Sequence, residues 1–126
     1  MSNPAGISGV GQIHVNVTDM ERATAFYRDV LGMQHLFTAG NMAFVMCGEV
    51  RLMLGIADKP EFAHPSSILY YKVDDIAAAY ETMAAHDVRF EEDPLMVHQA
   101  EDHDLWLAFF RDSEDNVMAL MSEVPR

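Results

Sequence analysis

Apolar and polar residues alternate near the start of the chain, and the period then changes. Ile13, Val15 and Val17 alternate with polar residues, which predicts a strand that is buried on one face only. From Met20 to Leu31, apolar residues recur at three- and four-residue spacing, which predicts an amphipathic helix. The chain therefore opens with a strand that leads directly into a helix.

Both ends of this predicted helix carry sequence signals. Thr18 and Glu21 have the spacing of a capping box, in which a hydroxyl and a carboxylate satisfy free amides at the helix start. Gly32 follows the last apolar residues and supplies the left-handed conformation that commonly ends a helix.

Strand-like runs and turn signals fill the rest of the chain. A tight turn at Gly48-Glu49 predicts a hairpin of segments 43–48 and 50–55. Two prolines and several turn residues mark residues 55–65 as a connector, and a second helical stripe starts at Asp74. The other predicted strands are segments 33–40, 68–75, 88–99, 104–112 and 116–123.

The second half of this pattern repeats the first at a constant offset, because segment 17–23 matches segment 73–79. Each copy consists of a strand, a helix and three strands. We therefore predict an α+β fold in one domain, residues 1–126, with two tandem βαβββ modules that form curved mixed sheets around a cleft. Module one spans about 8–55, the connector 56–65 and module two about 66–123. We expect the sheets to pair edge to edge, with the cleft lined by the faces that the helices leave uncovered.

Composition narrows the class of protein. Half of the residues are hydrophobic, but no apolar run approaches the length of a membrane span. The start of the chain lacks the pattern of a signal peptide, and the single cysteine, Cys47, is interpreted as a core thiol. These features predict a cytoplasmic protein. The formal charge of −12 argues against nucleic acid and anionic membranes as partners; it suits a cationic ligand or only keeps the protein soluble.

The segment from Ile13 to Gly32 follows the pattern I-x-V-x-V-x-D-hydrophobic-x-x-A-x-x-F-Y-x-x-V-L-G. It resembles the opening of the vicinal oxygen chelate superfamily, which includes glyoxalase I, extradiol dioxygenases and the fosfomycin and bleomycin resistance proteins. Segment 108–123 is similar to the family's F-x-D-P-x-G-N hairpin, with Ser113 in place of the proline and Asp115 in place of the glycine. Aspartate tolerates the left-handed conformation, so the turn is expected to survive.

The resemblance also implies four metal-ligand positions, which here are Gln12, Met53, Ile68 and Ala119. Gln12 offers one weak carbonyl ligand, and the other three offer nothing for a hard or borderline divalent ion. We therefore expect the family's usual metal site to be absent and no cofactor to be bound.

Strand parity places the remaining candidates on faces that line the cleft. They are Gln12, His14 and Asn16 on the first strand, Ile68, Tyr70 and Lys72 on its repeat, and Arg51 and Met53 on the fourth strand. His14 and Tyr70 occupy equivalent positions and are the candidate catalytic acid and base, or else they satisfy each other. The other six are candidate substrate-binding residues. Arg51 and Lys72 either bind a carboxylate or phosphate or meet surface acids.

Two further features allow more than one interpretation. Trp106 shares a strand face with Ala108 and Phe110, and it either lines the cleft as a substrate-binding residue or packs in the core. The segment from His98 to Asp104 contains two histidines and three acids; a solvated loop or a displaced site for a divalent metal are the alternatives.

Two functions follow from these expectations. The first is a metal-free small-molecule-binding protein of the bleomycin-resistance type that holds a polar or charged ligand. The second is a glyoxalase- or dioxygenase-like enzyme, a lyase, isomerase or oxidoreductase, that is metal-free or has a displaced metal site. Similar small members form homodimers, in which the βαβββ modules pair within or between chains to complete the cleft, and bare apolar strand edges agree with such pairing.

Overall fold

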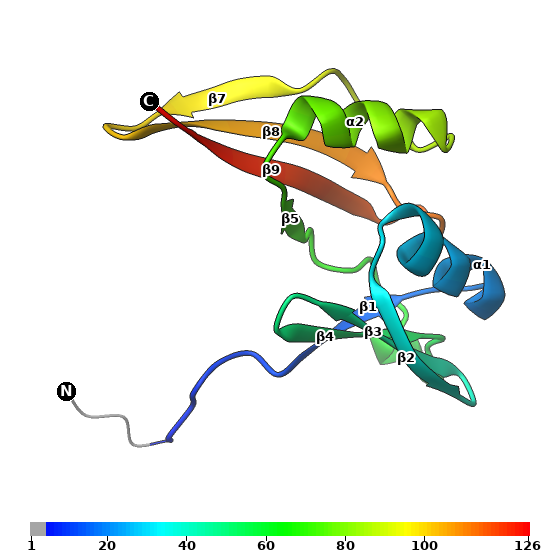
Figure 1. Ribbon diagram of the computed structural model, residues 1–126. Helices are drawn as coiled ribbons and strands as arrows, with labels where there is room; N and C mark the ends of the chain where they lie inside the picture. Colours follow the sequence, from blue (N-terminus) through cyan, green and yellow to red (C-terminus); the bar gives the residue numbers. More distant parts are fainter. Residues whose placement is uncertain (1–4) are drawn as a thin grey trace.

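The computed structural model describes residues 5–126 of the chain. Its first half follows the predicted order of a strand, a helix and three strands (Figure 1). These elements are β1 (Gln12–Asn16), α1 (Met20–Ala25) with its π-helical continuation η1 (Phe26–Val30), β2 (Gln34–Ala39), β3 (Met42–Cys47) and β4 (Val50–Gly55). The predicted hairpin turn is confirmed, because Gly48 joins β3 to β4 in the left-handed conformation, with φ of 59°.

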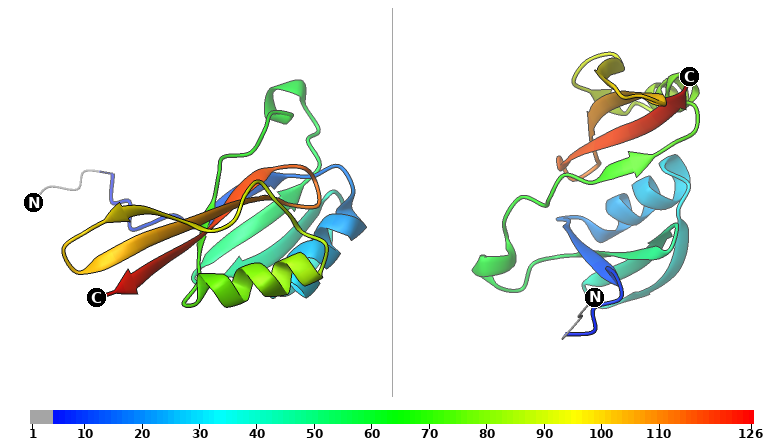
Figure 2. Two further views of the ribbon diagram at one scale, coloured as in Figure 1. Left: turned by 90° about the horizontal axis from the view of Figure 1, so that it is seen from above. Right: turned by 90° about the vertical axis from the view of Figure 1, so that its left-hand side faces the viewer.

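The second half begins after the connector, which contains the short 3-10 helix η2 (Pro60–Phe62) and projects from the rest of the molecule (Figure 2). Its elements are β5 (Tyr70–Lys72), α2 (Ile76–Ala85), β6 (Arg89–Phe90), β7 (Leu95–Gln99), β8 (His103–Arg111) and β9 (Val117–Pro125). The single strand predicted over residues 88–99 is wrong, since β6 and β7 are separate. Pro94 lies in the gap, and proline cannot donate to a strand ladder.

The strands form two sheets. The first sheet has the order β1-β4-β3-β2, and the second has the order β5-β9-β8-β6, with β7 also paired to β8. In both sheets the first strand of the half runs parallel to the last one, while the other pairs are antiparallel. The predicted α+β class with two mixed sheets is therefore confirmed.

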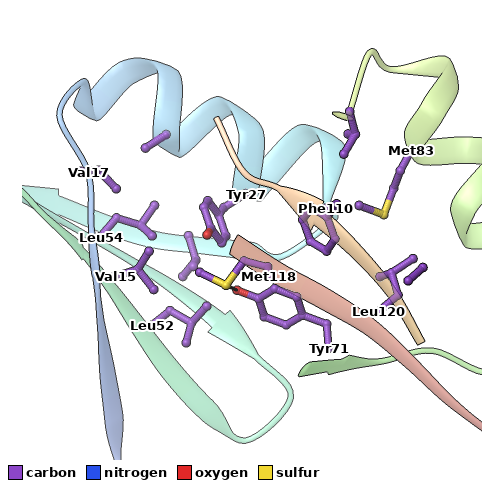
Figure 3. Close-up of a cluster of buried hydrophobic side chains, with 14 of the residues drawn as sticks. Val15, Val17, Tyr27, Leu52, Leu54, Tyr71, Met83, Phe110, Met118 and Leu120 are labelled. Carbon is purple, nitrogen blue, oxygen red and sulfur yellow. Dashed lines mark hydrogen bonds between the residues drawn. The ribbon is translucent and has the colours of Figure 1, made fainter. Parts of the chain in front are cut away.

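The buried core lies where the helix-covered faces of the two sheets meet. Val15, Leu52 and Leu54 line this face of the first sheet, while Phe110 and Met118 line the corresponding face of the second (Figure 3). Within residues 5–126 no hydrogen-bonded ladder joins the two sheets, so the expected edge-to-edge pairing does not occur within one chain. Burial of both apolar faces in one cluster is the physical reason, since it removes both from water together.

Polar contacts also join the halves at the start of α1. The helix is capped by Asp19, whose side chain accepts from the Arg22 amide at 3.0 Å, so the predicted capping box of Thr18 and Glu21 is wrong. The Thr18 hydroxyl instead donates a hydrogen bond to Glu114, from the turn before β9, with Thr18 Oγ1 and Glu114 Oε1 3.1 Å apart. The same Oε1 also accepts from the Thr18 and Asp19 amides at 2.8 and 2.9 Å.

The side chain of Glu114 is almost completely buried, with 1% exposed, and Arg22 Nε lies 2.8 Å from its Oε2. Burial alone raises the pKa of this carboxyl, but the hydrogen bonds from Arg22 and from the amides of Asp19 and Thr18 outweigh it. The pKa falls from 4.5 to about 2.

Two expectations about backbone conformation are confirmed, one of them in the turn that carries Glu114. Asp115 replaces the family's glycine and has φ of 67°, while Gly32 ends the first helical segment with φ of 76°. The buried carboxylate of Asp112 holds the turn by accepting from the amides of Glu114 and Asn116, and it also accepts from the hydroxyl of Tyr27 at 2.6 Å. No helix within residues 5–126 is long and apolar enough to cross a membrane.

Candidate functional site

The open face of the first sheet, opposite its buried face, holds four of the predicted site residues. Alternation along β1 and β4 directs Gln12, His14, Arg51 and Met53 to this face, because the residues between them are directed to the core. β1 and β4 are parallel neighbours in register, with Gln12 opposite Arg51 and His14 opposite Met53. The sequence-based expectation that these four residues converge is therefore confirmed.

A row of side chains crosses all four strands of this sheet. The pairings of His14 with Met53, of Met53 with Phe44 and of Phe44 with Phe37 place them side by side. The rings of Phe37 and Phe44 stack with centroids 4.6 Å apart, and Phe37 is 50% exposed. We call these four residues the open-face row.

Polar groups lie directly beside the open-face row. Gln12 Oε1 accepts a hydrogen bond from Arg51 Nε at 2.8 Å, and the Arg51 guanidinium lies 5.2 Å from the centre of the Phe44 ring. Gln12 Nε2 also approaches the Met53 sulfur at 3.6 Å. Arg51 is thus oriented by a hydrogen bond and by a cation–π contact, and it meets an amide rather than the surface acid that was the alternative expectation.

His14 lies against the end of β4. Its Nε2 is 3.4 Å from the carbonyl oxygen of Gly55, and a Cβ added at Gly55 would come within 2.8 Å of the same nitrogen. The absence of a side chain at Gly55 therefore allows the imidazole to rest on the sheet. Tyr70 is not its partner within the chain: the Tyr70 ring packs edge-on against Phe109 at 5.8 Å. The two side chains therefore do not satisfy each other within one chain.

A hollow of about 270 Å³ opens beside this row, at the base of the connector. The residues that line it include His14, Met53, Met42, Asp58 and Phe62. No sequence pattern singled out Asp58 or Phe62. Phe44, however, follows from counting outward from the hairpin turn, because residues equally distant from Gly48-Glu49 pair across β3 and β4.

Asn16, at the end of β1, ties the connector to this strand. Its backbone N–H donates to Ser66 Oγ at 2.7 Å, and its side-chain Nδ2 donates to the backbone carbonyl of His64. Its Oδ1 is buried without a protein partner within residues 5–126. A donor from a ligand would satisfy that oxygen, so Asn16 stays a binding candidate.

The other predicted site residues lie on the second sheet or beside it. Tyr70 and Lys72 are exposed on the uncovered face, and Lys72 Nζ lies 4.0 Å from a carboxylate oxygen of Glu123. Ile68 precedes β5 and is 45% exposed. Among residues 5–126, no hydrogen bond connects these side chains to His14 or Arg51, so a single chain holds two separate groups of candidates.

The expectation that Trp106 lines the cleft is wrong. β8 directs Trp106 to the same face as the buried Ala108 and Phe110, and the indole packs against the core cluster. Alternation along the strand is the reason, and it leaves Phe109 on the uncovered face in its place.

The acidic segment after β7 is a hairpin turn rather than a free loop. His98 belongs to β7 and His103 to β8, where the two imidazole nitrogens of His103 lie 2.7 Å from Asp102 and 3.0 Å from Glu123. In the described part of the chain, no group of three or more histidine, cysteine, aspartate or glutamate side chains is arranged to hold a metal ion.

The four positions where the family resemblance implies metal ligands carry an amide, a thioether and two aliphatic groups. Gln12 already accepts from Arg51, Met53 lies in the open-face row and Ala119 is fully buried between Tyr70 and Phe109 in the register of the second sheet. Thioether and aliphatic side chains do not suit a hard or borderline divalent ion, so this set does not fit one.

Comparison with known proteins now gives the family. A model of the Glyoxalase/Bleomycin resistance protein/Dioxygenase superfamily matches residues 9–97. The chain therefore belongs to this superfamily. No curated protein sequence matches the chain.

Solved structures agree on the fold. A superfamily member from Sphaerobacter thermophilus DSM 20745 has a TM-score of 0.78 and 24% identity, covering 93% of this chain and 98% of its own. TnmS3, an antibiotic binding protein from Streptomyces sp. CB03234, has a TM-score of 0.74 and 23% identity, with 94% and 98% covered. A lactoylglutathione lyase from Agrobacterium tumefaciens has a TM-score of 0.69 and 20% identity, with 93% and 95% covered.

Proposed function

We propose that this protein binds a small molecule on the open face of its first sheet and does so without a metal ion. The observation that carries the proposal is the open-face row with the Arg51–Gln12 pair beside it. Small-molecule sites typically combine an apolar, aromatic surface with a few convergent polar groups, and this face provides both. A planar ligand that carries a polar or charged group matches it.

We further propose that the protein is a homodimer whose second copy completes the site. Phe37, Met42, Ile68 and Tyr70 are 40–50% exposed on the faces or edges that the helices leave uncovered. Large apolar groups in such number favour pairing with another surface. A second copy that brings its Tyr70 and Lys72 against His14 and Arg51 would unite the two separate groups of candidates.

TnmS3 is an antibiotic binding protein with the same fold, so we expect this chain to bind its ligand without converting it. The side chains at the family's metal positions do not suit a metal ion, and this also supports ligand binding without a reaction. A single cysteine, which excludes an intrachain disulfide, agrees with a cytoplasmic setting.

Thermal-shift screening of charged aromatic compounds, followed by calorimetry, tests the ligand site. Binding should weaken in Arg51→Ala and His14→Ala but not in the matched controls Arg28→Ala and His86→Ala, which lie on the helical side of the two halves. Hits that respond equally to both pairs of variants would overturn the assignment of the site.

Metal analysis of protein purified without chelator tests the other half of the proposal. We expect no stoichiometric transition metal, and a metal that is lost in Gln12→Ala would contradict this. Mixing His14→Ala with Tyr70→Ala chains tests the shared site, since a mixed dimer contains one complete copy. Recovery of ligand binding on mixing is expected, and a monomer in analytical ultracentrifugation would exclude it.

A further inference from the structure

The hollow beside the open-face row carries a charge opposite to that of Arg51. Among the described residues that line it, Asp58 is the only acid, and none is a lysine or arginine. Within residues 5–126 the Asp58 carboxylate makes no hydrogen bond or ion pair. Lys59, next in sequence, places its ammonium over the Phe62 ring instead, 5.9 Å from the ring centre. The carboxylate is therefore available to a cation from outside the chain.

Arg51 and the hollow lie on opposite sides of the open-face row. Arg51, Met53 and Gly55 follow one another on the uncovered face of β4, and Met53 belongs to the row. Gly55 lines the hollow together with Asp58. At about 3.3 Å per residue, the Cα atoms of Arg51 and Gly55 are roughly 13 Å apart. A ligand that reaches both charged groups therefore crosses the row at Met53.

The walls of the hollow suit an organic ammonium group. The Phe62 ring is 44% exposed, and the face of an aromatic ring attracts a cation. The thioethers of Met42 and Met53 are soft and polarisable neighbours. One carboxylate with thioethers and a ring does not suit a hard metal ion. At about 270 Å³ the hollow holds one end of a drug-sized ligand, so the rest of such a ligand lies on the row.

We infer that the open-face ligand is an aromatic compound with a protonated amine at one end and an acid at the other. Its ammonium lies in the hollow between the Asp58 carboxylate and the Phe62 ring, its aromatic body crosses the row at Met53, and its acid meets Arg51. The inference rests on the proposed function and adds to it the sign of the charge at each end of the ligand.

Three biphenyl probes test the charge at the hollow. Each is a biphenyl-4-carboxylate, and the group at the 4′ position is aminomethyl, hydroxymethyl or carboxymethyl, so the far end is a cation, neutral or an anion. Isothermal titration calorimetry should show that the amine binds about two- to fivefold more tightly than the alcohol, the range of an exposed ion pair, and that the diacid binds most weakly. An alcohol or a diacid that binds as tightly as the amine would overturn the inference.

The carboxylate is tested by Asp58→Asn, which keeps the size of the side chain and removes its charge. This variant should weaken the amine probe by about two- to fivefold and leave the alcohol unchanged. Glu61→Gln is the matched control, because Glu61 is an exposed acid of the same connector that does not line the hollow. Undiminished affinity for the amine in Asp58→Asn would refute the assigned cation site.

The ring is tested by Phe62→Leu, which keeps an apolar side chain but removes the aromatic face. The preference for the amine over the alcohol should fall by about twofold or more. Phe37→Leu changes a ring of the row that does not line the hollow, so it should affect both probes alike. Equal effects of Phe62→Leu on the two probes would remove this ring from the cation site.

His14→Ala and Arg51→Ala distinguish failure of this inference from failure of the proposed function. Both variants should weaken the amine probe. Probes that bind with equal affinity, or an amine that does not bind, would overturn the inference alone if open-face ligands still depend on His14 and Arg51. Binding that is indifferent to both variants, whatever the charge of the probe, would overturn the proposed function and the inference with it.

Discussion

Leu52 and Met53 are consecutive residues of β4, yet they lie in opposite environments. Leu52 is 1% exposed and packs in the cluster that joins the two sheets, whereas Met53 lies in the open-face row beside His14 and Phe44. Both side chains are apolar and similar in size. The comparison shows that hydrophobicity alone does not separate residues that build this fold from those available to bind a ligand; strand parity does.

The two faces also differ in how their polar groups are used. At the covered junction, Glu114 and Asp112 are buried, and each carboxylate accepts hydrogen bonds from the first half of the chain. On the open face, Arg51 is exposed and Gln12 is its main partner. The first kind of group fixes structure, while the second retains capacity to bind something else.

Truncation of the neighbouring pair should give the largest contrast in stability. Leu52→Ala removes buried side-chain volume from the core and should lower the free energy of unfolding by roughly 2–5 kcal/mol. Met53→Ala should lower it by about 1 kcal/mol or less, because this site is partly open to solvent. Urea denaturation measures both. Equal losses would show that strand parity does not separate the two residues in their contribution to stability.

Acid should weaken the covered junction through Glu114. Its pKa is lower in the fold than in the unfolded chain, so the carboxylate stabilises the protein above about pH 4.5, and this contribution is lost as the pH falls toward 2. The drop from 4.5 to about 2 corresponds to roughly 3 kcal/mol. Glu114→Gln should therefore be less stable than the wild type at neutral pH and nearly equal to it near pH 2.

The exposed Glu91, which pairs with Arg111, serves as the matched control for Glu114. Glu91→Gln should change stability by less than about 1 kcal/mol at any pH. Thermal unfolding between pH 2 and 7 follows both variants. A constant difference between Glu114→Gln and the wild type across that interval would show that ionisation is not the cause.

A smaller change tests the open face itself. Gly55→Ala places a methyl group where the His14 imidazole now lies, and the exposed ring should turn away at a stability cost of about 1 kcal/mol or less. The ring resonances of His14 should shift in NMR spectra, and binding of open-face ligands should weaken. Gly11→Ala, where an added Cβ meets nothing within 4 Å, is the control. Unchanged ligand affinity would remove His14 from the site.

Local sequence patterns predict many of the strands, helices and turns of this protein. The alternation in β1, the helical stripe from Met20 and the left-handed Gly32 and Asp115 all follow from spacing and backbone preference, and the structure confirms them. The same parity predicts that Gln12 and Arg51 both line the uncovered face, where β1 and β4 place them opposite each other. These features depend on residues that are neighbours in sequence or linked by one short turn, so a pattern suffices to predict them.

Contacts between distant segments were decided only by the tertiary structure. Thr18 has the spacing of a capping box, but Glu114, far along the chain, accepts its hydrogen bonds instead, because the packed halves bring a buried carboxylate to free amides at the helix start. The meeting of the sheets through their covered faces, rather than edge to edge, has the same origin. The sequence determined which side of each strand is apolar; burial of both apolar sides in one core decided which surfaces were left for binding.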